Sequence, residues 1–178
     1  MHNIILGVTG SIAAYKAADL ANTLTKQGNS VHVIMTRGGM QFITPLTLQT
    51  LTKNKVHTDV FSLEHPETVE HISLAEQADL VVVAPASADF IAKAAAGIAD
   101  DMLTSVLLAA ADKPKLICPA MNTKMYENPI TQRNLRQLEN YGFYIAEPRE
   151  ARLACGAVGR GALASLDEIL SQISLLLS

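Results

Sequence analysis

The sequence is poor in charged residues, cysteine and aromatic residues. Charged residues make up 17% of the 178 residues, tryptophan is absent, and the two cysteines lack the spacing of metal ligands. The net charge is −3 and no basic run occurs, which argues against nucleic acid and acidic membranes as partners. No apolar run reaches the roughly 20 residues that span a bilayer, and the N-terminus has no basic flank or cleavage site. Two cysteines of this kind suit a reducing compartment, so we expect a cytoplasmic protein.

Apolar residues are abundant in contrast, at 49% of the chain. A typical soluble domain carries about 25% charged residues, so this chain has little polar surface to expose. Its length suits one domain, which we place over residues 1–178. We expect a sheet that is covered on both faces, and a further part of the surface that is buried in an oligomer.

The order of the expected elements indicates the fold. An apolar strand at 3–8 is followed by a turn, a helix that ends at Gly28-Asn29, and a second strand at 31–35. Residues 80–84 form a β-branched run, which is typical of a central parallel strand. This pattern predicts a three-layer Rossmann-like (flavodoxin-like) doubly wound parallel sheet in a single α/β domain. Other strands are expected at 56–60, 115–118 and 143–145, and helices at 42–51, 91–97, 101–111, 129–141 and 166–177.

The turn Thr9-Gly10-Ser11-Ile12 after the first strand is the first candidate site. A turn of this kind before a helix presents backbone N–H groups and a hydroxyl to an anion. It lacks the third glycine of the dinucleotide fingerprint, and the second strand ends in Thr36-Arg37, where an NAD site has an acidic residue. The sequence therefore predicts a mononucleotide phosphate site rather than an NAD site.

Asn122 is the second candidate, in the connection from the strand at 115–118 to the next helix. A residue at the carboxyl end of a parallel strand faces the crevice where such sheets bind ligands. The amide can donate to a carboxylate without the repulsion that an aspartate would bring. An asparagine here can equally cap the helix that follows, and the sequence leaves both interpretations open.

His71 and Cys155 are the remaining candidates. His71 opens a short helix, where the positive end of the helix dipole favours a neutral imidazole that can act as a general base. The alternative is an exposed polar residue without a function. Residues 147–164 contain three glycines within six residues, which predicts a mobile loop with an accessible Cys155. Cys118 lies within a strand and is expected to be inert.

Taken together, the chain resembles the homo-oligomeric flavin-containing cysteine decarboxylases. The resemblance covers essentially the whole chain and rests on several motifs in the same order. They are Gly10-Ser-Ile-Ala-Ala-Tyr-Lys16, His71-Ile-Ser-Leu74, Ala84-Pro-Ala-Ser-Ala88, Pro119-Ala-Met-Asn-Thr-Lys-Met-Tyr126 and Leu153-Ala-Cys-Gly156.

The resemblance implies an activity and an assembly. It implies FMN-dependent decarboxylation of 4′-phosphopantothenoyl-L-cysteine to 4′-phosphopantetheine, a step of coenzyme A biosynthesis, through thioaldehyde and enethiolate intermediates and without a metal. It also implies trimers, in some members grouped into dodecamers, with active sites between subunits.

The resemblance further implies roles for individual residues. His71 would be the catalytic base, Asn122 would hold the substrate carboxylate, and Cys155 would donate a proton from a substrate-covering flap formed by residues 147–164. FMN would contact Gly10, Ser11, Ile12, Thr36, Ser87, Ala88, Asp89, Phe90, Ser105 and Ala120, and the substrate would contact Asn122, Met125, Arg152 and Ala154.

Three positions depart from the family's pattern. Ala157 stands where the family usually has an aspartate, Asp89 replaces a common asparagine, and Tyr126 replaces a common tryptophan. The change at Ala157 predicts weaker closure of the flap, because a charged hydrogen-bond partner is lost. It leaves open a catalytically impaired relative that only binds flavin or regulates a partner. A peptidyl-cysteine decarboxylase and a flavin prenyltransferase are further alternatives, although Cys155 argues against the peptide enzyme, which releases the enethiol unreduced.

Overall fold

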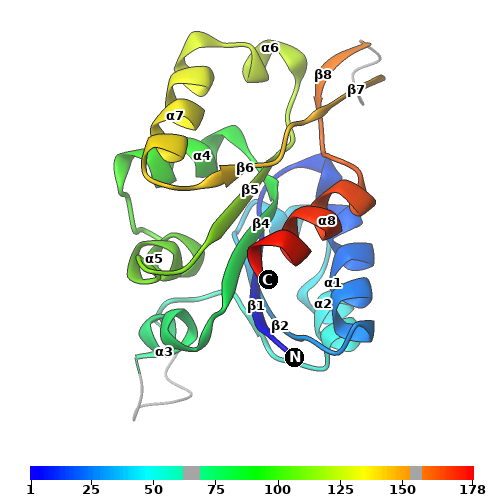
Figure 1. Cartoon of the computed structure of the whole chain (residues 1–178), viewed down its shortest axis with the longest axis vertical. Helices are drawn as coiled ribbons and strands as arrows, with labels where there is room; N and C mark the ends of the chain where they lie inside the picture. The colour runs from blue at the N-terminus through cyan, green and yellow to red at the C-terminus, as the bar shows by residue number, and fades with distance from the viewer. Residues whose placement is uncertain (62–68, 153–157) are drawn as a thin grey trace.

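A sheet of six parallel strands forms the centre of the computed structural model, which describes residues 1–61, 69–152 and 158–178 (Figure 1). The strand order is β3-β2-β1-β4-β5-β6, and each neighbouring pair is parallel. The order reverses between β1 and β4, which is the arrangement of a doubly wound fold. The strands are β1 (Asn3–Val8), β2 (Ser30–Met35), β3 (Val56–His57), β4 (Leu80–Ala86), β5 (Lys115–Pro119) and β6 (Tyr144–Ile145).

Helices cover both faces of this sheet, so the predicted three-layer Rossmann-like fold is confirmed. On one face lie α1 (Lys16–Lys26), α2 (Pro45–Thr52) and α8 (Leu166–Leu176), and on the other α3 (Glu70–Gln77), α4 (Ala88–Ala96), α5 (Met102–Ala109) and α7 (Pro129–Asn140) (Figure 1). Short helices occupy three turns: η1 (Ile12–Tyr15), η2 (Gly39–Gln41) and α6 (Thr123–Tyr126). No helix in the described ranges is long and apolar enough to cross a membrane.

The apolar runs of the sequence form two cores, one on each face of the sheet. Alternate residues of β1 point to opposite sides, so that Leu6 joins one core and Ile5 the other. Every residue of β4 is buried, as expected for a central parallel strand. Cys118 of β5 is also fully buried, and this burial raises the pKa of its thiol far above the usual range. The prediction that Cys118 belongs to the core is confirmed.

Strand β4 is longer than its β-branched run suggests. We expected it to break at Pro85, but it continues through this residue to Ala86, which pairs with Pro119 of β5. The register of the two strands shifts between Val83 and Ala86. A shift of this kind accommodates a proline, which cannot donate a ladder hydrogen bond.

The segment expected to be a loop contains a β-hairpin, so that part of the prediction was wrong. Strands β7 (Arg149–Arg152) and β8 (Val158–Ala162) pair with each other in antiparallel fashion. Glycine-rich β8 has little strand propensity of its own, but the backbone N–H of Met121 donates to the carbonyl of Gly161 (2.9 Å) and docks β8 on the turn after β5. Propensity within one strand does not reveal such a contact. Ala154, Cys155 and Ala157 lie outside the described residues.

Candidate functional site

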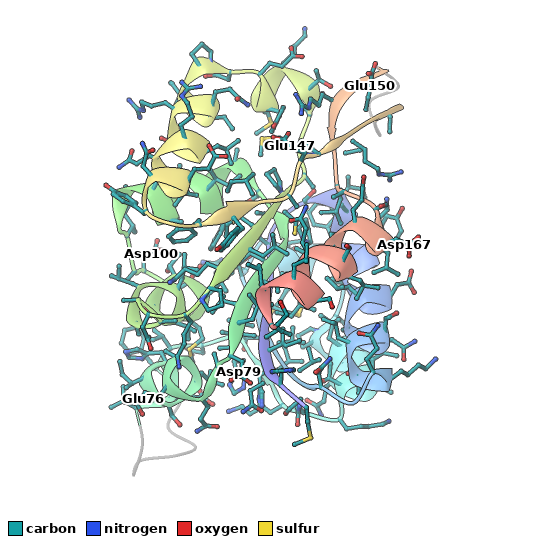
Figure 2. The ribbon with its side chains drawn as sticks, in the orientation of Figure 1. Glu76, Asp79, Asp100, Glu147, Glu150 and Asp167 are labelled. Carbon is teal, nitrogen blue, oxygen red and sulfur yellow. The ribbon has the colours of Figure 1, made fainter. Side chains whose placement is uncertain are left out.

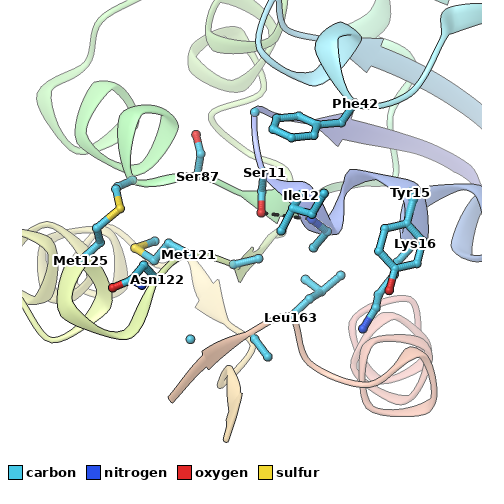
Figure 3. Close-up of a pocket in the computed structure, with 16 residues that line it drawn as sticks. Ser11, Ile12, Tyr15, Lys16, Phe42, Ser87, Met121, Asn122, Met125 and Leu163 are labelled. Carbon is cyan, nitrogen blue, oxygen red and sulfur yellow. Dashed lines mark hydrogen bonds between the residues drawn. The ribbon is translucent and has the colours of Figure 1, made fainter. Parts of the chain in front are cut away.

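Two adjoining cavities lie at the carboxyl edge of the sheet, where the strand order reverses between β1 and β4. Their volumes are about 540 and 900 Å³, within the usual range of small-molecule sites. Gly10, Ser87, Ala88 and Met125 line both. We call them the first and the second cavity, and Figure 3 shows the residues around the first.

Buried Thr9 joins the two turns that form the common wall of these cavities. Its hydroxyl donates to the carbonyl of Pro85 (2.7 Å) and accepts from the backbone N–H of Ser87 (2.8 Å). The turns after β1 and β4 are therefore held in one geometry by a single side chain. Thr9 belongs to the predicted anion-binding turn, but nothing local in the sequence shows that its hydroxyl meets Pro85, 76 residues further along the chain.

The turns after β1 and β2 approach each other as closely as their backbones allow. A Cβ atom on Gly10 would lie 3.1 Å from the Cα of Gly38, which leaves no room for a side chain without displacement of the backbone. Thr36 stabilises the second of these turns, since its hydroxyl oxygen accepts from the backbone N–H of Gly39 (3.2 Å). Thr36 and Gly10 thus line the second cavity from two neighbouring turns.

The N-terminus of α4 points toward the same crevice. Ser87 caps this helix, because its hydroxyl oxygen accepts from the backbone N–H of Phe90 (3.3 Å). The next N–H groups, of Ala88 and Asp89, have no acceptor within the helix and suit an anion. Asp89 itself forms an ion pair with Lys93 (3.5 Å), which also binds Asp100 (3.1 Å).

The residues predicted to contact FMN gather around these two cavities, with one exception. Ser11, Ile12 and Ala120 line the first cavity, and Thr36, Asp89 and Phe90 line the second. The donor set fits a mononucleotide flavin, since N–H groups and hydroxyls suit its phosphate and small residues leave space for a planar ring. Ser105 of α5 is not among the residues that line either cavity.

Asn122 combines both of the interpretations that the sequence left open. Its side-chain oxygen accepts from the backbone N–H of Lys124 (2.9 Å) and caps α6, while the residue also lines the first cavity. The cap uses the side-chain oxygen, and the NH₂ group of an amide is a donor of the kind that suits a carboxylate. Met121 and Met125 stand beside Asn122 and supply apolar surface (Figure 3).

The hairpin is attached to this same turn by polar and aromatic contacts. Arg160 of β8 pairs with Glu147, and its guanidinium lies over the ring of Tyr126 (5.8 Å to the centroid). The Tyr126 hydroxyl donates to Glu147 (3.3 Å). Burial, followed by the carboxylate of Glu147, raises the pKa of Tyr126. Figure 2 shows Glu147 near the base of the hairpin and Glu150 further along it.

His71 does not meet Asn122 within one chain. It lies on α3, at the opposite end of the molecule from α6, and lines neither cavity (Figure 1). The adjacent Glu70 is anchored to β3, because it binds the imidazole of buried His57 (2.9 Å) and the ammonium of Lys55 (3.0 Å). His57 lies within the strand expected at 56–60, and no local feature of the sequence indicates its pairing with Glu70.

A family model described as "Flavoprotein" matches the chain over residues 1–178. The curated relatives include a "Probable phosphopantothenoylcysteine decarboxylase" of Streptococcus mutans, 54% identical over 171 residues that cover 96% of each chain. The "Coenzyme A biosynthesis bifunctional protein CoaBC" of Bacillus subtilis is 47% identical over 168 residues. The match covers 94% of this chain but 41% of that relative, so the chain spans about two fifths of the bifunctional protein.

Solved structures of two decarboxylases share the fold. A PPC decarboxylase variant complexed with pantothenoylaminoethenethiol superposes with a TM-score of 0.87, at 32% identity, over 98% of this chain and 97% of the other. The FMN-dependent cysteine decarboxylase SpaF superposes with a TM-score of 0.86, also at 32% identity, over 99% and 95% of the two chains. These likenesses confirm the resemblance that the five sequence motifs indicated.

Proposed function

The chain belongs to the flavoprotein family, and from that membership we propose that it is an FMN-dependent decarboxylase that converts 4′-phosphopantothenoylcysteine to 4′-phosphopantetheine. The observation that carries the proposal is the position of Asn122, which lines a cavity at the reversal point of the sheet together with the turns after β1 and β4. The 54% identical relative, matched over nearly its full length, supports the choice of substrate.

FMN would be held at the common wall of the two cavities. The turn Gly10-Ser11-Ile12, the start of α4 and Thr36 offer N–H groups and hydroxyls, and Ala120 offers a small apolar contact. When bound, the flavin supplies a reversible two-electron oxidation, which lets the cysteine moiety lose carbon dioxide without net redox change. Ser105 remains a proposed contact only if a neighbouring chain completes the site.

Asn122 would bind and orient the carboxylate that leaves as carbon dioxide. Its NH₂ group carries no charge, so it fixes the carboxylate without an ion pair that would oppose the loss of that charge. Met125 beside it would exclude water from the reacting end of the substrate. Exclusion of water strengthens the polar contacts that remain in the cavity.

His71 would accept a proton from the substrate at a site shared between two protomers. Because α3 lies far from α6 within one chain, His71 of one protomer has to meet Asn122 of another. Exposed apolar side chains flank both residues: Val69 and Ile72 beside His71, and Met125 beside Asn122. Surfaces of this kind favour association. The number of subunits, a trimer with trimers grouped into dodecamers in some members, is what the family resemblance implies, and we propose it for this chain.

The hairpin would carry the proton donor. Cys155 is proposed to protonate the product, and Ala154 and Arg152 to contact the substrate, from the connection between β7 and β8. Residues 147–164 would thereby form the proposed flap over the first cavity, which Gly161, Ala162 and Leu163 line. We also place the enzyme in the cytoplasm, which suits a small-molecule decarboxylase with reduced cysteines.

The proposal is tested with the purified chain of residues 1–178. We expect a yellow protein that releases FMN on denaturation and that converts phosphopantothenoylcysteine to a product lighter by the mass of one carbon dioxide. Mass spectrometry of product and flavin checks both expectations. A preparation that binds no added FMN, or that binds FMN and leaves the substrate intact, would contradict the proposal.

A further inference from the structure

We propose that Lys16 and Arg149 form a subsite for the terminal phosphate of the substrate, at the end of the first cavity opposite Asn122. This inference rests on the proposed function, because it assigns the far end of the same substrate. It concerns specificity rather than the reaction itself, which takes place at the cysteine end.

Lys16 and Asn122 stand on opposite sides of the first cavity. Figure 3 shows the Lys16 side chain beside Tyr15 at one side, and Asn122 with Met121 and Met125 at the other. Beyond Lys16 the space continues into a smaller cavity of about 280 Å³, which Arg149 also lines. Tyr15, Lys16 and Leu163 belong to both cavities, so the two spaces adjoin. A ligand extended from Asn122 would reach this pair of cations.

The two cations repel each other as they stand. Burial lowers the pKa of the Lys16 ammonium, and the positive charge of Arg149 lowers it further. Within the described part of the chain, neither side chain forms an ion pair with a carboxylate. A phosphate between the two groups would relieve this repulsion, since it offers several acceptor oxygens and negative charge.

The backbone holds Arg149 in place for such a role. Its Nε donates to the carbonyl of Leu163 (3.0 Å), and the rest of the guanidinium remains available as a donor.

Two carboxylates lie near the proposed subsite and lower its positive potential. Asp19 lines the smaller cavity. The carboxylate of Glu168 interacts electrostatically with Arg149, but it accepts its hydrogen bonds from the backbone N–H and the hydroxyl of Ser165 (2.8 and 2.7 Å).

The middle of the first cavity is apolar, between the amide of Asn122 and the ammonium of Lys16. Ile12, Ala13, Met121 and Leu163 line this stretch. A matching ligand has a carboxylate at one end, an aliphatic middle and a phosphate at the other end. Phosphopantothenoylcysteine has this order of groups, whereas a peptide with a C-terminal cysteine carries no phosphate. The subsite would thus select the small molecule over a peptide.

FMN is the other source of a phosphate in this site. The N–H groups at the start of α4 and the turn at Ser11 already offer places for it, on the walls shared with the second cavity. Lys16 and Arg149 do not line that second cavity. We therefore assign them to the substrate, and the experiment separates the two sources.

The test compares the enzyme's preference for a phosphorylated over a dephosphorylated substrate. Lys16→Met should lower the ratio of kcat/KM for phosphopantothenoylcysteine to that for pantothenoylcysteine by about tenfold or more, as expected for a charge-assisted hydrogen bond. Arg149→Gln should lower the same ratio, and Lys16→Arg should largely keep it. Lys26→Met is the matched control, because Lys26 lies exposed on the same helix and lines none of the three cavities.

A binding measurement gives a readout without turnover. Calorimetry on the FMN-loaded protein should show that Lys16→Met weakens binding of 4′-phosphopantetheine about tenfold and brings it toward that of pantetheine. An unchanged ratio and unchanged affinities would overturn the subsite. Loss of the preference for FMN over riboflavin in Lys16→Met would also overturn it, since the phosphate would then be that of the flavin. Wild-type protein that turns over neither substrate would contradict the decarboxylase proposal, while the calorimetric comparison would still decide the subsite.

Discussion

The hydroxyl oxygen of Thr9 accepts a hydrogen bond from the backbone N–H of Ser87 (2.8 Å), and this contact joins the two turns between which the proposed flavin site lies. Thr9 also donates to Pro85 (2.7 Å) and is 1% exposed. One buried hydroxyl therefore satisfies two backbone groups at the point where the strand order reverses.

Replacement of this hydroxyl should weaken both the fold and flavin binding. Thr9→Val keeps the shape but leaves the N–H of Ser87 without its acceptor, which costs about 1–3 kcal/mol of unfolding free energy. We expect a weaker affinity for FMN as well. Thr9→Ser, which retains the hydroxyl, is the control and should recover most of both quantities. Urea unfolding and a flavin fluorescence titration measure them, and a Thr9→Val protein equal to wild type would refute the role.

Asn122→Asp separates the binding role of this residue from its capping role. Aspartate caps a helix as well as asparagine does, so the thermal midpoint should change little. A carboxylate beside the substrate carboxylate repels it, and kcat/KM should fall by at least about tenfold because the two like charges would stand close together. Steady-state kinetics measure the expected fall in kcat/KM, and a thermal melt of the same preparation measures the expected constancy of the midpoint. Unchanged kinetics would remove Asn122 from the substrate site.

Mixed oligomers test whether two chains share each site. His71→Asn and Asn122→Asp should each be inactive with FMN bound. If the two variants are co-expressed, about one site in four should contain an intact His71 and an intact Asn122 from different chains. Activity should therefore return in mixed oligomers, isolated by two different affinity tags. Mixed oligomers without activity would indicate that both residues act within one chain.

The hairpin should depend on Gly161. This residue has φ = +146°, and a Cβ there would overlap the carbonyl oxygen of Met121. Gly161→Ala should lift β8 from the turn that bears Asn122 and raise KM several-fold. Gly142→Ala is the control, because Gly142 also has a positive φ (+83°) but no atom within 4 Å of the added Cβ. It should cost about 1 kcal/mol of stability and leave KM unchanged. Equal KM values in wild type, Gly161→Ala and Gly142→Ala would show that substrate binding does not depend on the contact between β8 and the turn that bears Asn122.

Acid should destabilise the contact between β3 and α3. Burial lowers the pKa of His57 below 6.5, and the positive charges of Lys55 and His32 lower it further. The carboxylate of Glu70 acts in the opposite direction but does not outweigh the burial. Burial raises the pKa of Glu70, but hydrogen bonds and charges from Lys55 and His57 outweigh it, so the pKa lies below 4.5. For both side chains the pKa is lower in the folded state than in the unfolded state. Each side chain therefore contributes its full share of stability at a pH above its unfolded-state pKa and loses that share as the pH falls.

On acidification, the stability contributed by His57 decreases from about pH 6.5 downward, and that of Glu70 from about pH 4.5. The free energy of unfolding should therefore fall between pH 7 and pH 5, and His57→Gln should show a smaller fall. Urea unfolding at the two pH values measures the difference. The same fall in both proteins would show that other groups, such as His32, account for it.

The fold and the turns that line the proposed flavin site could be predicted because their signals are local. Residues 80–84 form a β-branched run that fits only a strand covered on both faces, and the turn at Gly10-Ser11 follows a strand directly. The hairpin at 149–162 could not be predicted, since glycine-rich β8 depends on a contact with Met121 from another part of the chain. Ser105 was assigned by resemblance alone, and this residue of α5 lines neither cavity.

The sequence by itself determined the order of strands and helices along the parallel sheet, and it placed the candidate site at the turns that follow the strands, because the period of apolar residues and the turn motifs depend on neighbours in the chain. Only the tertiary structure decided which distant groups meet. It brought Thr9 to Ser87, Glu70 to His57 and Lys16 near Arg149, and it set His71 apart from Asn122. Contacts of this kind depend on how the layers pack against the sheet, and the packing of layers leaves no periodic signal in any single segment.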